Sequence, residues 1–150
     1  MAWIRLSEKK DIDYIAPRMR QADVAEVRAS DGCSPLEALR MSYSLSEPCF
    51  TGMDGDTPIA MFGAVPLLDN VGSVWLLGTD AISESIPISF LRWSRRFLPF
   101  LMEPYDMVCN LVDARNTVHI KWIRWLGFNF LNKTIHGPEQ LPFYEFARLA

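Results

Sequence analysis

The chain has 150 residues, of which 49% are hydrophobic and 22% are charged, so its composition is that of a folded protein. Its net charge of -3 at pH 7 gives it no general attraction to phosphate backbones, and nucleic acid is not expected as its main partner. The length fits one domain, which would bury roughly two-thirds of the surface that its unfolded form exposes.

Cysteine and histidine are too few and too scattered to predict disulfides or a metal site. The cysteines are odd in number and widely spaced, and only His119 and His136 accompany them. The longest apolar run, 59–68, is broken by Gly63 and Pro66 and is about half as long as a membrane-spanning helix. The first ten residues lack the apolar stretch of a secretory signal. We therefore expect a soluble protein that is made in the cytoplasm, with no membrane span and no metal.

The first 45 residues are expected to form one strand and three helical segments. In chain order these are a strand at 2–6, a helix capped by Ser7 and interrupted at Pro17, a helix at 22–29 and a helix at 35–44. The last has the clearest signal. Ser34 is a good N-cap, Pro35 is tolerated at the first helical position, and Glu37 completes a capping box.

The remaining elements predict a mixed sheet covered by helices. In chain order they are a hairpin of 49–53 and 59–65, a strand at 74–79, a helix capped by Ser83 or Ser85 and kinked or ended at Pro99, a strand at 107–112, a helix before Gly127, a loop at 132–138 and a strand at 142–149. The hairpin implies antiparallel pairing, whereas the helical crossover after 74–79 implies parallel pairing. The fold class is therefore α/β (α+β), with a mixed, mostly antiparallel central sheet flanked by helices in a single domain.

Residues 110–128 have the clearest structural signals, because their sequence predicts a buried strand, a turn, a helix and a glycine stop. Asp113 or Asn116 is expected to cap the helix by accepting a hydrogen bond from a free amide of its first turn. Gly127 is expected just past the helix end at positive φ, with Phe128 folded back onto the last turn. Helical spacing places two sets of side chains on opposite faces: Val118, Trp122, Trp125 and Leu126 on the buried face, and Lys121 and Arg124 on the other.

This order of elements, together with the spacing of Asn116, Gly127 and Phe128, resembles the GNAT acyltransferase superfamily over residues 51–130. In that family the penultimate helix begins near an asparagine and ends in Gly-Phe. The resemblance implies a GNAT-like sheet, and it implies acetyl-CoA as the cofactor if the chain is an active member.

A closer resemblance, over nearly the whole chain, is to the internal virion protein A group of short-tailed phages. It rests on four stretches, at 23–30, 75–80, 110–116 and 125–128. Members of that group are GNAT-like in fold and are described as virion or assembly proteins. The resemblance implies a virion-associated protein made in the host cytoplasm, with portal, core or tail components of the virion as its partners.

The coenzyme site of GNAT enzymes does not carry over to this sequence. Those enzymes hold the coenzyme pyrophosphate on backbone amides between the fourth strand and the next helix, where glycines let the phosphates approach. Here residues 79–85 contain no glycine, arginine or glutamine, and they carry Asp80 and Glu84. A carboxylate about 5 Å from a phosphate oxygen costs on the order of 3 kcal/mol at an effective dielectric of about 20. The candidates that remain for cofactor binding are Thr79, Ala81, Ser83 and Ser85.

The usual proton donor is also missing. Many GNAT enzymes use a tyrosine of the penultimate helix to protonate the leaving thiolate, and that position aligns with Ile123. His119 is the one ionisable residue of interest in this helix that the family pattern lacks. It is the only candidate catalytic residue, since a neutral imidazole can act as a base near pH 7. The alternative interpretation of His119 is a packed or capping side chain.

We therefore predict a catalytically inactive, GNAT-like virion or assembly protein that acts through protein–protein contacts without a cofactor. Its candidate interaction or structural residues are Trp122, Trp125, Gly127, Phe128, Arg92, Arg95 and Arg96, the three arginines being interpreted as a solvated face. Two alternatives stay open. One is an active acetyl-CoA-dependent N-acyltransferase, and the other is an inhibitor that binds a host factor.

Overall fold

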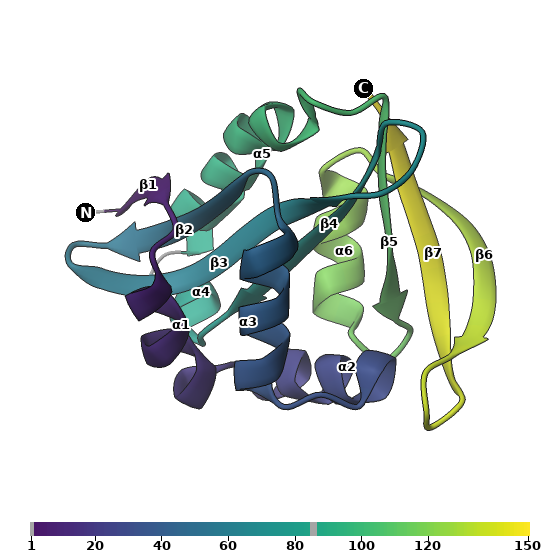
Figure 1. Cartoon of the computed structure of the whole chain (residues 1–150), viewed down its shortest axis with the longest axis horizontal. Coiled ribbons are helices and arrows are strands. Elements are labelled where there is room, and N and C mark those ends of the chain that lie inside the picture. The colour runs from purple at the N-terminus through teal and green to yellow at the C-terminus, as the bar shows by residue number, and fades with distance from the viewer. Residues whose placement is uncertain (1, 85–86) are drawn as a thin grey trace.

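A computed structural model describes residues 2–84 and 87–150, and within these ranges it forms a seven-stranded sheet in the order β1-β2-β3-β4-β5-β7-β6 (Figure 1). The strands are β1 (Ala2–Leu6), β2 (Cys49–Asp54), β3 (Thr57–Pro66), β4 (Val71–Gly78), β5 (Met107–Asp113), β6 (Asn129–His136) and β7 (Leu141–Leu149). The helices are α1 (Lys9–Ile15), the 3-10 turn η1 (Ala16–Arg18), α2 (Gln21–Asp31), α3 (Pro35–Leu45), α4 (Ala81–Glu84), α5 (Pro87–Met102) and α6 (Thr117–Trp125).

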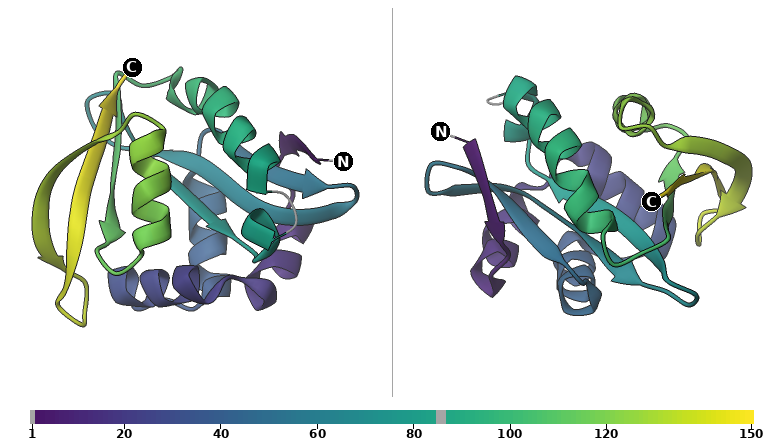
Figure 2. Two further views of the ribbon diagram at one scale, coloured as in Figure 1. Left: turned by 180° about the vertical axis from the view of Figure 1, so that it is seen from behind. Right: turned by 90° about the horizontal axis from the view of Figure 1, so that it is seen from above.

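The sheet is mixed and mostly antiparallel, and it is flanked by helices, as the sequence predicts. β4 and β5 run parallel to each other, and the other neighbouring strands pair antiparallel. α5 and α6 lie on one side of the sheet, and α1 and α3 lie on the other (Figure 2). α2 runs across the ends of β4 and β5 (Figure 1). No helix within the described ranges is long and apolar enough to cross a membrane.

Each side of the sheet has its own apolar core. Under α6 the core contains Val108, Val112, Ile123, Leu126, Phe128 and Phe146. Under α1 and α3 it contains Ile12, Ile15, Leu39, Met61 and Leu77. β4 contributes to both cores, because side chains of successive strand residues point to opposite faces. β4 is therefore buried on both faces, as its nearly continuous apolar sequence indicates.

Several local signals are confirmed. The Ser34 side chain accepts a hydrogen bond from the amide of Glu37, and Pro35 is the first residue of α3. α1 ends at Ile15, and η1 then contains Pro17. Asn116 caps α6 by accepting a hydrogen bond from the His119 amide at 3.4 Å.

The glycine stop is also confirmed. Gly127 has φ +89°, and the ring of Phe128 packs edge-on against Phe146 at a centroid distance of 5.2 Å.

The predicted cap of the first helix is wrong. α1 begins after Glu8, whose amide donates to the Asp11 carboxylate at 2.8 Å. A carboxylate is a stronger acceptor than a hydroxyl, and Asp11 is fully buried in this position. The Ser7 hydroxyl instead lies 2.8 Å from the hydroxyl of Thr51 on β2.

The predicted loop at 132–138 is also wrong, because β6 continues to His136 and pairs with β7. β6 is an edge strand whose residues are largely exposed on both faces, so it lacks the apolar alternation that identifies a strand. An irregularity in register between Phe130 and Lys133 further masks the pattern.

The remaining corrections concern element ends and one helix face. β4 begins at Val71, and α5 continues beyond Pro99 to Met102. Ser83 belongs to the short helix α4, and Ser85 lies outside the described residues. Val118 and Trp125 are 65% and 39% exposed, because the buried row of α6 is His119, Ile123 and Leu126.

Candidate functional site

β4 and β5 separate soon after they begin to pair. They form only three residue pairs, from Val71 with Met107 to Ser73 with Cys109. The side chain of Asn110 then donates to the carbonyl of Val74 at 2.6 Å and accepts from the Leu111 amide at 2.7 Å. Because one side-chain amide occupies the gap between the two backbones, the parallel ladder stops there.

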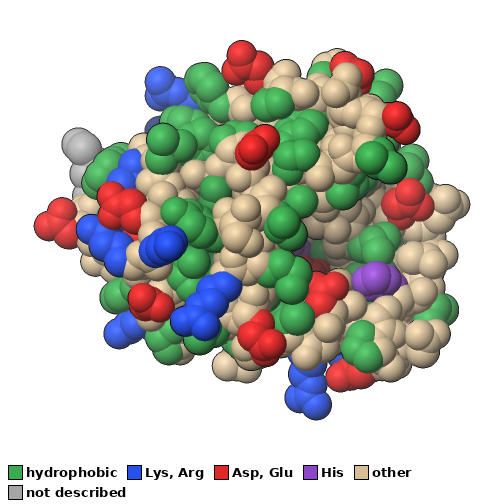
Figure 3. Space-filling view, in the orientation of Figure 1, with side chains coloured by type: hydrophobic (Ala, Val, Ile, Leu, Met, Phe, Trp, Pro, Cys, Tyr) green, Lys and Arg blue, Asp and Glu red, His purple; other side chains and the backbone are tan. Residues whose placement is uncertain are grey.

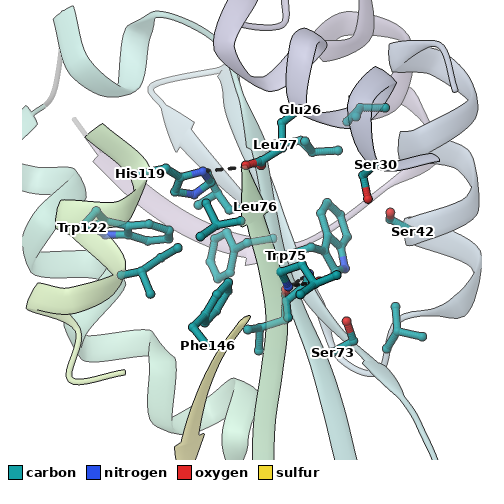
Figure 4. Close-up of a pocket in the computed structure, with 18 of the residues that line it drawn as sticks. Glu26, Ser30, Ser42, Ser73, Trp75, Leu76, Leu77, His119, Trp122 and Phe146 are labelled. Atoms are coloured by element: carbon teal, nitrogen blue, oxygen red, sulfur yellow. Dashed lines mark hydrogen bonds and ion pairs between the residues drawn. The ribbon is translucent and has the colours of Figure 1, made fainter. Parts of the chain in front are cut away.

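A cavity of about 430 Å³ follows this separation. Its walls come from helices on both sides of the sheet, so it occupies the gap between β4 and β5. Figure 3 shows a hollow on one face, with acidic and histidine side chains at its edge. Apolar walls and a few polar groups are typical of small-molecule sites. The polar members drawn and labelled in Figure 4 are Glu26, Ser30, Ser42, Ser73 and His119.

α2 joins the separated ends of the two strands. At its start, the Arg20 amide donates to the Gly78 carbonyl at 2.8 Å, and the Gly78 amide donates to the Asp23 carboxylate at 3.0 Å. One turn later, the Glu26 carboxylate accepts from the amide of Asp113 at 2.8 Å. α2 therefore supplies hydrogen-bond partners to the last residue of both β4 and β5, and it closes the wide end of the cleft.

Glu26 is the most perturbed acid of the cleft. Burial raises the pKa of this carboxyl from 4.5 to about 7, and the charges of Asp23 and Asp113 add to the increase. The hydrogen bond from the Asp113 amide opposes these effects without cancelling them. Near pH 7 Glu26 can therefore both accept and release a proton.

His119 lies opposite Glu26, with its Nδ1 atom 3.8 Å from a Glu26 carboxylate oxygen (Figure 4). Burial lowers the pKa of the imidazole from 6.5 to about 4. The ring also stacks on Trp122 at a centroid distance of 5.1 Å, and Nδ1 lies 3.3 Å from the side-chain nitrogen of Asn116. The short distance to Glu26 is therefore a contact of a neutral imidazole and not an ion pair at neutral pH.

The sequence analysis named His119 as a candidate, and His119 lines the cavity, but it did not identify Glu26. Asp23 and Glu26 fall within the helix predicted at 22–29, and their spacing is that of an ordinary polar helix face. Their role depends on where the ends of β4 and β5 lie.

The predicted cofactor-binding residues that the structure describes follow the end of β4, and two of their side chains are hydrogen-bonded within the chain. The Thr79 hydroxyl donates to the carbonyl of Ile59 at 3.0 Å, so it is directed away from the cleft towards β3. The Ser83 hydroxyl donates to the carbonyl of Asp80, and Ala81 is half-buried at the start of α4. Ser85 lies outside the described residues.

Three of the predicted interaction residues, Trp122, Trp125 and Arg95, lie between α5 and α6. Trp122 donates its indole N–H to the Ser94 hydroxyl at 3.0 Å and packs against Phe90 at 5.4 Å. The Arg95 guanidinium lies 3.9 Å from the ring centre of Trp125. Arg92 and Arg96 are exposed on α5, in agreement with their interpretation as a solvated face. In the part of the chain that the structure describes, no three metal-ligating side chains gather.

The whole chain superimposes on solved structures of N-acetyltransferases. One from Staphylococcus aureus Mu50 has 14% sequence identity and a TM-score of 0.75, with 99% of this chain and 98% of that chain covered. A GNAT-family acetyltransferase from Bacillus anthracis has 11% identity and a TM-score of 0.70, with 99% and 94% covered. A GCN5-related N-acetyltransferase from Kribbella flavida has 18% identity and a TM-score of 0.66, with 99% and 98% covered.

These similarities establish the fold, which is that of the GNAT acetyltransferases. No family model and no curated protein matches this chain. The resemblance to the phage virion proteins therefore stays a prediction.

Proposed function

We propose that this GNAT-fold chain acts by binding other proteins and not by transferring an acyl group. The observation that carries the proposal is the hydrogen bond from the Gly78 amide to the buried carboxylate of Asp23. Gly78 immediately precedes the segment where GNAT enzymes bind the coenzyme pyrophosphate. In this chain an internal anion, paired with Arg20 at 2.9 Å, already occupies the end of that strand.

The neighbouring charges support the same conclusion. Asp80 and Glu84 are exposed in the segment that would face the phosphates, and Glu26 and Asp113 lie across the cleft. Like charges repel most strongly where water is scarce, so a bound pyrophosphate would be destabilised at this end of the cleft.

The position of the missing proton donor supports the proposal as well. Ile123 is 3% exposed and lines the cavity with an aliphatic side chain, which cannot donate a proton. His119 is the ionisable residue of α6 that lines the cavity, and its imidazole is neutral at pH 7 because burial lowers its pKa to about 4. A neutral imidazole is a poor acid for a leaving thiolate.

The contacts between α5 and α6 provide a third line of support. Phe90 and Trp122 touch across the groove between the two helices, and the Trp122 indole is held by Ser94. A long cofactor that reached the cleft from this side would have to displace these contacts.

The test of the proposal is calorimetric titration of the chain with acetyl-CoA and with coenzyme A. We expect no binding heat at millimolar ligand. Glu26→Gln is the informative variant, because it removes one negative charge from the cleft while keeping the shape of the side chain. Saturable binding of acetyl-CoA by the unchanged chain would refute the proposal.

The partners that we propose are virion components of a short-tailed phage, such as portal, core or tail proteins. This part of the proposal is supported by the sequence resemblance alone. Mass spectrometry of purified particles and assembly intermediates tests it, and absence of the chain from both would exclude a role in the virion.

One observation favours a second candidate function, an acetyl-CoA-dependent N-acyltransferase. Glu26 has a pKa near 7 inside the cleft, as expected for a general base that accepts the proton of an ammonium substrate. The amine nitrogen would then attack the thioester carbonyl, the C–S bond would break, and the thiolate would take up the proton that the attacking nitrogen loses. This candidate predicts a rate that rises with pH around 7 and is lost in Glu26→Gln.

A further inference from the structure

The outer faces of α5 and α6 concentrate positive charge in an otherwise acidic chain. The two helices carry five of the fifteen basic residues and none of the eighteen acidic ones, so they have a charge of +5 while the rest of the chain has -8. The basic residues are Arg92, Arg95, Arg96, Lys121 and Arg124, and all are exposed. Within residues 2–84 and 87–150, no carboxylate forms an ion pair with any of them.

Exposed apolar side chains lie between these charges. Ile88, Leu91 and Arg95 are spaced three and four residues apart, so they share one side of α5. Because Arg95 stacks on Trp125 and donates to its carbonyl at 3.3 Å, this side faces α6. On α6, Val118 lies two turns before Trp125 and therefore shares the side that faces α5.

We call this strip the α5–α6 seam and define it by Ile88, Leu91, Val118 and Trp125. These side chains are 66%, 39%, 65% and 39% exposed. The left view of Figure 2 shows the two helices in front of the sheet. An exposed apolar strip with charges on both sides is typical of a surface that binds a partner.

We propose that the α5–α6 seam binds an acidic amphipathic helix of a partner protein. The apolar face of such a helix would cover the seam, and its carboxylates would meet Arg92 and Lys121 on either side. A groove between two helices is a common binding site for a third helix. This inference rests on the proposed function, since it gives the protein–protein contact a surface and a chemistry.

A protein helix fits the seam better than a nucleic acid does. Ile88, Leu91 and Val118 are aliphatic and offer neither a hydrogen bond nor a ring to a nucleotide. Trp125 has a ring that could stack on a base, but Arg95 already covers one face of it. The charge of -8 on the rest of the chain would also repel a long polyanion.

The test is fluorescence anisotropy with a labelled peptide of about five helical turns that has leucine on one face and glutamate on the other. A peptide with the same composition in scrambled order is the control for charge alone. We expect micromolar binding of the amphipathic peptide by the full chain, and binding of the scrambled peptide that is weaker by about tenfold or more.

Two pairs of substitutions localise the binding. Arg92→Glu with Lys121→Glu reverses two charges beside the seam, and we expect it to weaken peptide binding by about tenfold or more. Lys9→Glu with Arg40→Glu makes the same change of charge at exposed positions of α1 and α3, and we expect little effect. Circular dichroism would verify that all variants are folded.

Equal binding of the two peptides, or equal weakening by the two pairs of substitutions, would overturn the inference. Tighter binding of a duplex DNA or of anionic vesicles than of the peptide would also overturn it. The acetyl-CoA titration separates this outcome from failure of the proposed function. If neither acetyl-CoA nor the peptide binds, only the α5–α6 seam is wrong as the contact surface.

Discussion

The two ends of α2 hold the two edges of the cleft with carboxylates in different surroundings. Asp23 binds the end of β4 and is paired with Arg20 at 2.9 Å. Glu26 binds the end of β5, and the side chain opposite it is a neutral histidine. Both carboxylates accept a backbone N–H, so the arginine is the main difference between them.

For a buried carboxylate that already accepts a backbone N–H, a charged partner decides the direction in which the pKa shifts. Asp113 gives the same lesson on β5. It is also buried, but the Arg115 side chain lies 2.7 Å away and holds the pKa of this carboxyl below its ordinary value despite burial. Glu26 lacks such a partner, and its pKa rises to about 7.

Removal of the Asp23 carboxylate, which is paired with Arg20, should have the largest effect on stability. We expect Asp23→Ala to lower the free energy of unfolding by about 3–5 kcal/mol, because it leaves a largely buried arginine and the Gly78 amide without their acceptor. Urea denaturation at pH 7 measures this change. A loss below about 1 kcal/mol would mean that the two ends of α2 are equivalent and that the comparison is wrong.

Removal of the Glu26 carboxylate, which has no cationic partner at neutral pH among the described residues, should instead raise stability. The pKa of Glu26 is higher in the folded state, so its contribution to stability is complete below pH 4.5 and is lost as the pH rises towards 7. We expect Glu26→Gln to be more stable than the unchanged chain by up to about 3 kcal/mol at pH 8, and to gain nothing at pH 4. Urea denaturation at the two pH values checks this.

Substitution of His119 should reverse the pH dependence. Its pKa is lower in the folded state, so its contribution is complete above pH 6.5 and is lost as the pH falls towards 4. Between pH 4.5 and 6.5 the contributions of Glu26 and His119 therefore oppose each other.

We expect the stability of His119→Gln to fall with rising pH and that of Glu26→Gln to rise with it. Thermal unfolding between pH 4.5 and 6.5 measures both slopes, and the double variant is the control that should lose both contributions. Parallel slopes in the two single variants would contradict the assignment.

The smallest effect is expected at the far end of α6, away from both carboxylates. Gly127 has φ +89°, and an added Cβ would lie 3.7 Å from the nearest atom of Arg148, so the strain comes from the backbone alone. We expect Gly127→Ala to cost about 1 kcal/mol at every pH. A cost that changed with pH would show that the α2 region and the end of α6 are coupled.

The sequence predicts the elements that have strong local signals. Ser34, Pro35 and Glu37 determine the start of α3, and Asn116 and Gly127 determine both ends of α6. β6 could not be predicted, because an edge strand held by its backbone ladder needs no apolar pattern.

The candidate site was harder to predict than the fold. His119 was identified from its residue type, but its pKa and its partner depend on burial and on the placement of α2. Glu26 meets Asp113 across 87 residues of chain, and no local pattern specifies such a contact.

The short β4–β5 pairing also has a consequence for how the molecule opens. The described β4–β5 ladder has only three residue pairs, and the Asp106 amide, the Asn110 side chain and α2 add a few hydrogen bonds to it, so the sheet divides into a β1–β4 unit and a β5–β7 unit. Units joined by so few bonds exchange their amide hydrogens independently once the link opens. Native-state hydrogen exchange should therefore resolve two protected groups of amides, and Asp23→Ala should widen the difference between their opening free energies.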